Sequence, residues 1–167
     1  MIDRWMGESI RRAMQTMHGE WLTSPLRGLC ATGGGPIIAA MPIVRCATPA
    51  EASAAVDRVV ASQGSALFVF FGSEDPKTGE SWCPDCVTAD PVLRRTITTL
   101  RKDLTLHECP VGERSAWKNQ PAHPYRLHPL FRVARIPTLV FIADGIERGR
   151  LVEADCAKPE LVAAFLA

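Results

Sequence analysis

The sequence predicts an α/β protein with a central mixed β-sheet flanked by helices and preceded by an N-terminal extension. The apolar run Ala66–Phe71 has no polar face, which is typical of a strand buried on both sides at the centre of a sheet. Strand patterns alternate with helical patterns along the chain, which favours an α/β arrangement. Near the end, Thr138–Ile142 and Arg150–Glu153 flank a turn at 143–145 and indicate a hairpin.

A change in composition near Met41 divides the chain. All five methionines lie at or before this residue, and the Gly-rich stretch 27–36 resembles a linker. We therefore expect an extension over 1–40 and one domain over 41–167. Residues 4–22 have the apolar spacing of an amphipathic helix. The alternatives are a poorly ordered segment, sequence upstream of a start at Met41, or an organelle-targeting segment, against which its acidic residues argue.

Local signals place the elements of the domain. Ile43–Cys46 is expected to be a strand. A helix should then begin after Thr48, with Thr48 as N-cap, Pro49 in the first turn, Glu51 closing a capping box and Gly64 ending the helix. The remaining expectations are the strand Ala66–Phe71, a polar loop Gly72–Ser81, a helix from Cys83 to about Arg101 bent at Asp90-Pro91, a strand Leu104–Cys109, helical stretches near 113–119 and 123–132, the hairpin, and a last helix Pro159–Phe165.

Charge and cysteine content exclude several classes of protein. The net charge of +1 provides no basic field for nucleic acid and no polybasic cluster for an anionic membrane. The run Pro36–Val44 is too short to span a bilayer. We expect a soluble, intracellular protein that binds neither nucleic acid nor membrane. Of the six cysteines, Cys46, Cys109 and Cys156 are scattered singly and are interpreted as small buried hydrophobic residues.

The motif Trp82-Cys83-Pro84-Asp85-Cys86 follows the central strand and carries the chemistry. Two thiols one helical turn apart can close a disulfide and so exchange two electrons with a substrate disulfide. If Cys83 opens a helix, unpaired N–H groups and the helix dipole favour its thiolate. Cys83 is therefore predicted to be the nucleophile, next to solvent, and Cys86 the more buried resolving cysteine. A Cys-x-x-Cys within β-α-β is typical of thioredoxin-like redox sites.

Other residues of the motif, and a proline far from it, are predicted to support the thiols. Pro84 stiffens the first turn. Asp85 either caps helix N–H groups or is only solvated, and Trp82 either limits access or fills the core. Ile136-Pro137 directly precedes a strand. In thioredoxin folds a cis X-Pro bond faces the cysteine pair and exposes backbone groups to a bound substrate strand, and the resemblance of the motif to such sites implies the same here. The alternative is a proline that only begins the strand.

Several roles stay open at the level of sequence. Cys83 and Cys86 could bind zinc with His107-Glu108-Cys109, although we favour no metal. The proton of Cys86 could pass to Glu74, Asp75 or water, and the loop 72–81 is hypothesised to narrow access to the site. A further set could either fix an anionic part of a substrate or hold a helical insertion together: Trp117, Lys118 and Arg126.

From about Met41 to the end, the chain resembles the thioredoxin domain-containing protein 17 family, also called thioredoxin-related protein of 14 kDa or the Clot-like group. The matching segments are Phe71-Gly72-Ser73, Ser81–Cys86, Ala89–Val92, Val111–Arg114, Trp117–Asn119, Tyr125-Arg126, Ile136–Leu139 and Leu151–Cys156. Residues 122–130 depart from the family pattern beyond Tyr125-Arg126, which puts partner contacts there in doubt.

The resemblance implies a thioredoxin-like fold and a cytosolic protein-disulfide reductase. It implies electrons from NADPH through thioredoxin reductase, no bound cofactor, and as substrates small disulfides such as cystine and selected disulfide-containing proteins. We expect a monomer. The alternative is a redox-sensing adaptor or binding module on the same scaffold, without turnover.

Overall fold

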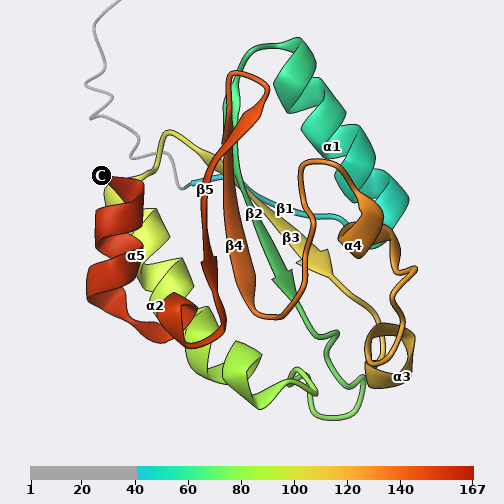
Figure 1. Cartoon of the computed structure of the whole chain (residues 1–167). Coiled ribbons are helices and arrows are strands. Elements are labelled where there is room, and N and C mark those ends of the chain that lie inside the picture. Colours follow the sequence, from blue (N-terminus) through green and yellow to red (C-terminus); the bar gives the residue numbers. More distant parts are fainter. Residues whose placement is uncertain (1–40) are drawn as a thin grey trace, which may run out of the picture. The chain divides into compact units, whose positions relative to one another are not determined.

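The computed structural model describes residues 41–167, and the predictions for 1–40 lie outside this part (Figure 1). Five strands form one mixed sheet in the order β1-β3-β2-β4-β5. β1 and β2 pair in parallel with β3, whereas β4 pairs antiparallel with β2 and β5. The strands are β1 (Ile43–Arg45), β2 (Ser65–Phe71), β3 (Thr105–Pro110), β4 (Thr138–Ala143) and β5 (Ile146–Val152). The predicted mixed sheet, with Ala66–Phe71 in its central strand, is confirmed.

Helices cover both faces of the sheet. The helices are α1 (Pro49–Ala61), α2 (Pro84–Leu100), α3 (Arg114–Trp117), α4 (Pro124–Leu127) and α5 (Pro159–Leu166), with a 3-10 turn, η1 (Glu153–Ala157), before α5. In Figure 1, α1 and α4 lie on one side of the sheet, and α2 and α5 lie on the other. Each side has its own apolar core, in which Phe68 and Phe70 face α1, and Leu67 and Leu139 face α2. No helix in the described part is long and apolar enough to cross a bilayer.

The start of α1 follows the predicted capping signal with one difference. The Thr48 hydroxyl accepts a hydrogen bond from the Glu51 N–H at 3.2 Å, as an N-cap should. The Glu51 carboxylate reaches back to the N–H of Ala47, at 2.9 Å, one residue before the cap. The helix ends at Ala61, ahead of the predicted end at Gly64.

The second half of the domain contains less helix than predicted. The stretch 113–119 gives only α3, and 123–132 gives only α4, because Lys118 and His128 adopt extended backbone conformations. His128 precedes Pro129, and a residue before proline is sterically biased away from helix. The hairpin strand begins at Ile146, earlier than predicted, after a two-residue turn in which Asp144 and Gly145 both have positive φ.

A buried carboxylate ties the outer strand β1 to α2. Glu108 on β3 is 7% exposed and lies opposite Arg45 on β1 and Val69 on β2. Its carboxylate forms ion pairs with Arg94 of α2 and with Arg45. Arg45 also pairs with Glu74 in the loop after β2. Because a buried charge is costly unless it is paired, these arginines hold the loop, the outer strand and α2 around Glu108.

Removing one of these partners should destabilise the domain. We expect Arg94→Met to lower the free energy of unfolding by about 1–3 kcal/mol, because Glu108 loses a charged partner while it stays buried. The matched control is Arg95→Met, an exposed neighbour on the same helix, which should have little effect. Urea unfolding of the reduced protein measures both changes, and equal stabilities of the two variants would refute this role of Arg94.

Candidate active site

The site is built on the N-terminus of α2, where Cys83 is the N-cap. Its sulfur accepts a hydrogen bond from the Cys86 N–H at 3.4 Å. Pro84, in the first turn, has no N–H to satisfy, so its position costs no hydrogen bond. The Ser81 hydroxyl fixes the approach to the helix: it accepts from the Cys83 N–H at 3.2 Å and donates to the Gly72 carbonyl at 2.6 Å.

The loop before β4 brings a backbone carbonyl to the nucleophile. The Ile136–Pro137 peptide bond is cis, as predicted. The Ile136 carbonyl oxygen lies 3.9 Å from the Cys83 sulfur. Two contacts support this loop, because the Thr138 hydroxyl donates to the Arg135 carbonyl at 2.7 Å and the Glu153 N–H donates to the Pro137 carbonyl at 2.7 Å. The structure thus brings together two segments that lie far apart in the sequence.

The two thiols differ in acidity. Both are free thiols. A hydrogen bond from the Cys86 side chain lowers the pKa of Cys83 to about 7, and the Cys86 N–H contributes in the same direction. The pKa of Cys86 is raised, because its thiol donates that hydrogen bond and because it is buried. A thiolate at Cys83 beside a thiol at Cys86 is the state in which Cys83 can attack a disulfide.

The predicted position of Cys83 next to solvent is wrong. We expected Cys86 to be the more buried of the two, but both residues are buried and are 5% and 4% exposed. Trp82 and Ile136 flank Cys83 in the same groove and leave only a small part of it accessible. What distinguishes the two cysteines is therefore their position on the helix, since only Cys83 lies where the free N–H groups point.

Trp82 combines the two alternatives considered for it. Its indole N–H donates to the Gly112 carbonyl at 2.9 Å, and its ring packs on the apolar core. A Cβ at Gly72 would come within 2.7 Å of this ring, so the close approach requires glycine. Trp82 also forms one wall of the groove that contains Cys83. It therefore fills space and limits access at once.

Asp85 is exposed, and the cap at this helix end is the Cys83 sulfur instead. Asp85 lines the same groove as Cys83, which has a volume of about 560 Å³.

Arg126 has a structural role. Its guanidinium stacks on the Trp117 ring, 3.8 Å from the ring centroid, and donates to the Ala134 carbonyl at 2.6 Å. This contact favours the structural alternative for Arg126 and Trp117, whereas Lys118 is exposed at the groove.

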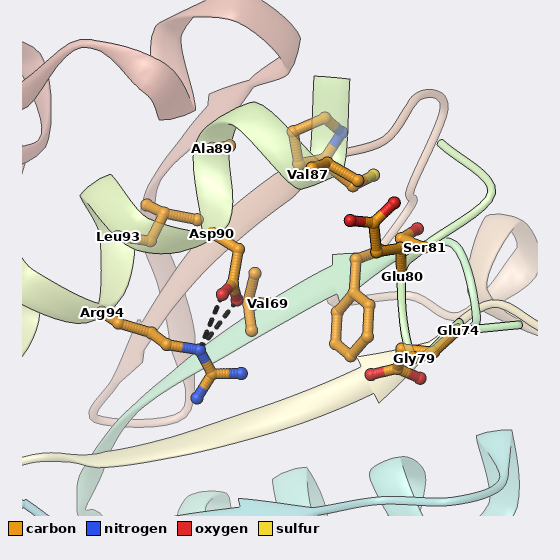
Figure 2. A pocket seen from close by; sticks show the side chains of 13 residues that line it. Val69, Glu74, Gly79, Glu80, Ser81, Val87, Ala89, Asp90, Leu93 and Arg94 are labelled. Atoms are coloured by element: carbon orange, nitrogen blue, oxygen red, sulfur yellow. Dashed lines mark hydrogen bonds and ion pairs between the residues drawn. The ribbon is translucent and has the colours of Figure 1, made fainter. Parts of the chain in front are cut away.

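Cys86 borders a second cavity, of about 280 Å³. Figure 2 shows the side chains that line this cavity. Carboxylates of Glu74, Glu80 and Asp90 line it, whereas Asp75 is not part of its lining. Asp90 is paired with Arg94, as the dashed lines in Figure 2 show, and the Arg45 pair lowers the pKa of Glu74. Glu80 was not considered at the level of sequence, because only the fold of the loop brings it to Cys86.

The histidines do not gather around the thiols. His107 stacks on Phe68 and contacts Cys46, and His123 contacts the Val111 carbonyl. Within residues 41–167, no group of three or more His, Cys, Asp or Glu side chains is placed to hold a metal ion. The zinc site considered from His107, Glu108 and Cys109 is therefore not assembled in the described part of the chain.

Comparisons with known proteins bear on the family and the fold of the chain. Residues 48–167 match the family described as "Thioredoxin domain-containing protein 17-like, thioredoxin domain". The chain belongs to this family. It is 37% identical over 101 residues to the thioredoxin-like protein Clot of Arabidopsis thaliana, covering 60% of this chain and 75% of that one. It is 34% identical over 99 residues to human thioredoxin domain-containing protein 17, covering 59% of this chain and 76% of that one.

Solved structures support the fold. Thioredoxin O2 of Arabidopsis thaliana matches with a TM-score of 0.53 at 18% identity, covering 75% of this chain and 95% of that chain. This likeness shows a thioredoxin fold. Family and fold together make the chain a thioredoxin-like protein of the redox oxidoreductase class.

The lowered pKa of Cys83 predicts how alkylation depends on pH. Because iodoacetamide reacts with thiolate, the labelling rate of Cys83 in the reduced protein should rise with pH, with a midpoint near pH 7. Cys86→Ala removes the thiol that donates to Cys83, and should move the midpoint toward the roughly 8.5 of a free cysteine. Cys156, whose pKa burial raises to about 12, is the internal control and should stay unlabelled. A Cys83 midpoint above pH 8 would contradict the assigned electrostatics.

Proposed function

We propose that the protein is a thiol–disulfide oxidoreductase that reduces disulfides through Cys83 and Cys86. The observation that supports this most directly is the position of the Cys83 sulfur, which caps α2, receives a hydrogen bond from Cys86 and contacts the Ile136 carbonyl. The helix cap and the hydrogen bond from Cys86 stabilise a thiolate, and the Ile136 carbonyl is a backbone acceptor with which an extended substrate can pair.

The proposed reaction has two exchange steps. The Cys83 thiolate attacks one sulfur of the substrate disulfide, forms a mixed disulfide and releases the first substrate thiolate. Cys86 then loses its proton toward the cavity lined by Glu74, Glu80 and Asp90, and its sulfur attacks Cys83. The second substrate thiolate leaves, and a Cys83–Cys86 disulfide remains. Two electrons have passed from the dithiol to the substrate.

The electron source and the substrates are further parts of the proposal. We propose that thioredoxin reductase restores the dithiol with electrons from NADPH, and that the chain binds no cofactor of its own. The proposed substrates are small disulfides such as cystine and selected protein disulfides. We propose a cytoplasmic monomer that contacts neither nucleic acid nor membrane, with organelle targeting by residues 1–40 as the alternative location.

Charges in the groove support small disulfides that carry carboxylates. The groove is lined by more cationic than acidic residues. The cationic residues are Arg114, Lys118, Arg126 and Arg135, and the acidic residues are Asp85 and Glu153. Arg135 is paired with Glu153, and Arg126 is held by backbone carbonyls. Arg114 and Lys118 form no ion pair among the described residues. These two cations can therefore attract a carboxylate of a disulfide bound at Cys83.

The loop 72–81 contributes less to this groove than hypothesised. Its residues Gly79, Glu80 and Ser81 line the Cys86 cavity, whereas the Cys83 groove begins at Trp82. The loop is closed on itself by the Glu74–Ser81 bridge and by a hydrogen bond from the Gly79 N–H to the Asp75 carbonyl at 2.8 Å. It acts on access through Trp82, whose ring it holds in the groove wall.

Substitution of each cysteine tests the proposed roles. With cystine, thioredoxin reductase and NADPH, the wild type should consume NADPH through many cycles. The rate of NADPH consumption should be at least about a hundredfold lower for Cys83→Ser, because the nucleophile is gone. Cys86→Ser should also fail to cycle, but it should accumulate a mixed disulfide at Cys83 that mass spectrometry detects. Cys156→Ser is the control and should cycle normally.

Two results would count against the enzyme. Full activity of Cys83→Ser would remove Cys83 as the nucleophile. Oxidation of the wild type in a single stoichiometric step, with no further NADPH consumption, would favour the redox-sensing adaptor.

Reversal of the groove charges should act on substrate affinity. The double variant Arg114→Glu/Lys118→Glu should raise KM roughly three- to tenfold for glutathione disulfide, which carries a net negative charge, and less for zwitterionic cystine. The value of kcat should change little, because neither side chain contacts the reacting sulfurs. The matched control Arg95→Glu/Lys102→Glu makes the same change in charge at two exposed positions. Arg95 lies on α2, and Lys102 lies just after the end of α2. An equal rise in KM in both double variants would show that net charge alone is responsible.

A further inference from the structure

A second pair of cysteines lies outside the described site, on the edge of the sheet. Cys46 directly follows β1, and its N–H donates to the Glu108 carbonyl at 2.8 Å, which extends the ladder by one residue. Arg45 is paired with Glu108, so the next residues in register are Cys46 and Cys109. Adjacent strands lie about 4.8 Å apart, and disulfides join residues whose Cα atoms are about 4.4–6.8 Å apart.

The side chains of the two cysteines turn to the same side of the sheet. Both belong to the core that faces α1. Both sulfurs contact the same residue: Cys46 Sγ lies 3.9 Å from the His107 ring nitrogen Nδ1, and Cys109 Sγ lies 3.8 Å from the His107 carbonyl oxygen. The His107 ring is held by stacking on Phe68, with ring centroids 4.6 Å apart. The pair is therefore fixed by packing as well as by strand register.

The two sulfurs are unequal in acidity, as at the first site. A hydrogen bond from the Cys109 side chain lowers the pKa of Cys46. Burial raises the pKa of Cys109. Cys46 is also the more approachable member, because it follows the edge strand β1, whose three residues are all exposed, while β3 is covered by β2 on its other side. Edge strands and chain ends open locally at lower cost than central strands.

We propose that Cys46 and Cys109 are a second redox pair, which a hydroperoxide oxidises to a disulfide linking β1 to β3. The Cys46 thiolate attacks the O–O bond of the peroxide, becomes a sulfenic acid and releases an alcohol, or water when the peroxide is hydrogen peroxide. The Cys109 sulfur then attacks Cys46 Sγ, and the hydroxyl leaves as water with the Cys109 proton. Two thiols lose two electrons and two protons, and the peroxide is reduced.

This pair is not suited to the reduction of bulky disulfides. Cys46 is 2% exposed and Cys109 is fully buried, and neither lines either of the two pockets described above. A small peroxide can reach sulfurs that a peptide disulfide cannot. We assign the pair a sensing role: the disulfide fixes the edge strand and so couples the stability of the fold to the oxidant level. The proposal does not depend on turnover at Cys83.

Tryptic mapping of the full chain tests the linkage directly. The reduced protein is treated with graded hydrogen peroxide under native conditions, and free thiols are then blocked with N-ethylmaleimide. Trypsin places Cys46 alone in peptide 46–58, Cys109 alone in 103–114, and Cys83 with Cys86 in 78–94. We expect peptides 46–58 and 103–114 to be joined, and dithiothreitol to separate them. The expected result is the same in a Cys83→Ser/Cys86→Ser background.

Variants provide the controls. Cys46→Ala should leave Cys109 as a free thiol after oxidation, whereas Cys156→Ala, a buried cysteine of the other core, should leave the linkage intact. The same peroxide treatment should raise the melting temperature of Cys156→Ala by several degrees more than that of Cys46→Ala, because only Cys156→Ala gains the cross-strand bond.

The proposal is overturned if peptides 46–58 and 103–114 remain separate at a peroxide dose that fully oxidises Cys83 and Cys86. It is also overturned if Cys46 joins Cys30, in peptide 28–45, instead of Cys109. Equal melting temperatures of the oxidised and reduced wild type, with the linkage present, would overturn the sensing role.

Discussion

The hydrogen bond between the Cys86 N–H and the Cys83 sulfur is the interaction on which the site depends. The first turn of a helix has N–H groups without intrahelical acceptors, and α2 satisfies one of them with sulfur in place of the usual hydroxyl or carboxylate oxygen. A thiolate is a stronger acceptor than a thiol or a disulfide sulfur. The cap therefore stabilises the reduced, ionised form, so the start of the helix and the reactivity of Cys83 have the same origin.

This cap works only because neighbouring elements hold it in place. β2 ends at Phe71, and the chain then needs Gly72 to let the Trp82 ring pass close to its backbone. The hydrogen bond from Trp82 to the Gly112 carbonyl ties this arrangement to the segment after β3. From the other direction, the support of the Ile136 loop by Glu153 fixes the carbonyl opposite the sulfur. The segments that follow β2 and β3 and the segment that precedes β4 thus each support the site.

Local chemistry allowed the motif and its frame to be predicted from the sequence. The capping residues of α1, the apolar run Ala66–Phe71 of β2 and the thiol spacing are short-range signals, and each agrees with the structure. The shortness of α4 could have been inferred from Pro129, because proline disfavours helix at the residue before it.

The exposure of Cys83 and the Cys86 cavity depend on contacts between distant segments. No local sequence pattern predicts that Ile136 and Trp82 flank Cys83 in one groove, or that Glu80 and Cys86 line the same cavity. The same is true of Cys46 and Cys109, which look like isolated cysteines until the register of β1 on β3 is known. Sequence spacing reveals a pair only when both members lie on one element.

The two cysteine pairs show how position in the fold separates two kinds of thiol chemistry. In each pair one sulfur receives a hydrogen bond from the other and becomes the more acidic, while its partner stays protonated. The pairs differ in access. Cys83 lines a groove of about 560 Å³ that also contains Arg114 and Lys118, which form no ion pair among residues 41–167. Cys46 directly follows the edge strand β1, is 2% exposed and lines neither of the two pockets described above. This difference in access favours disulfide exchange at Cys83 and reaction with small peroxides at Cys46.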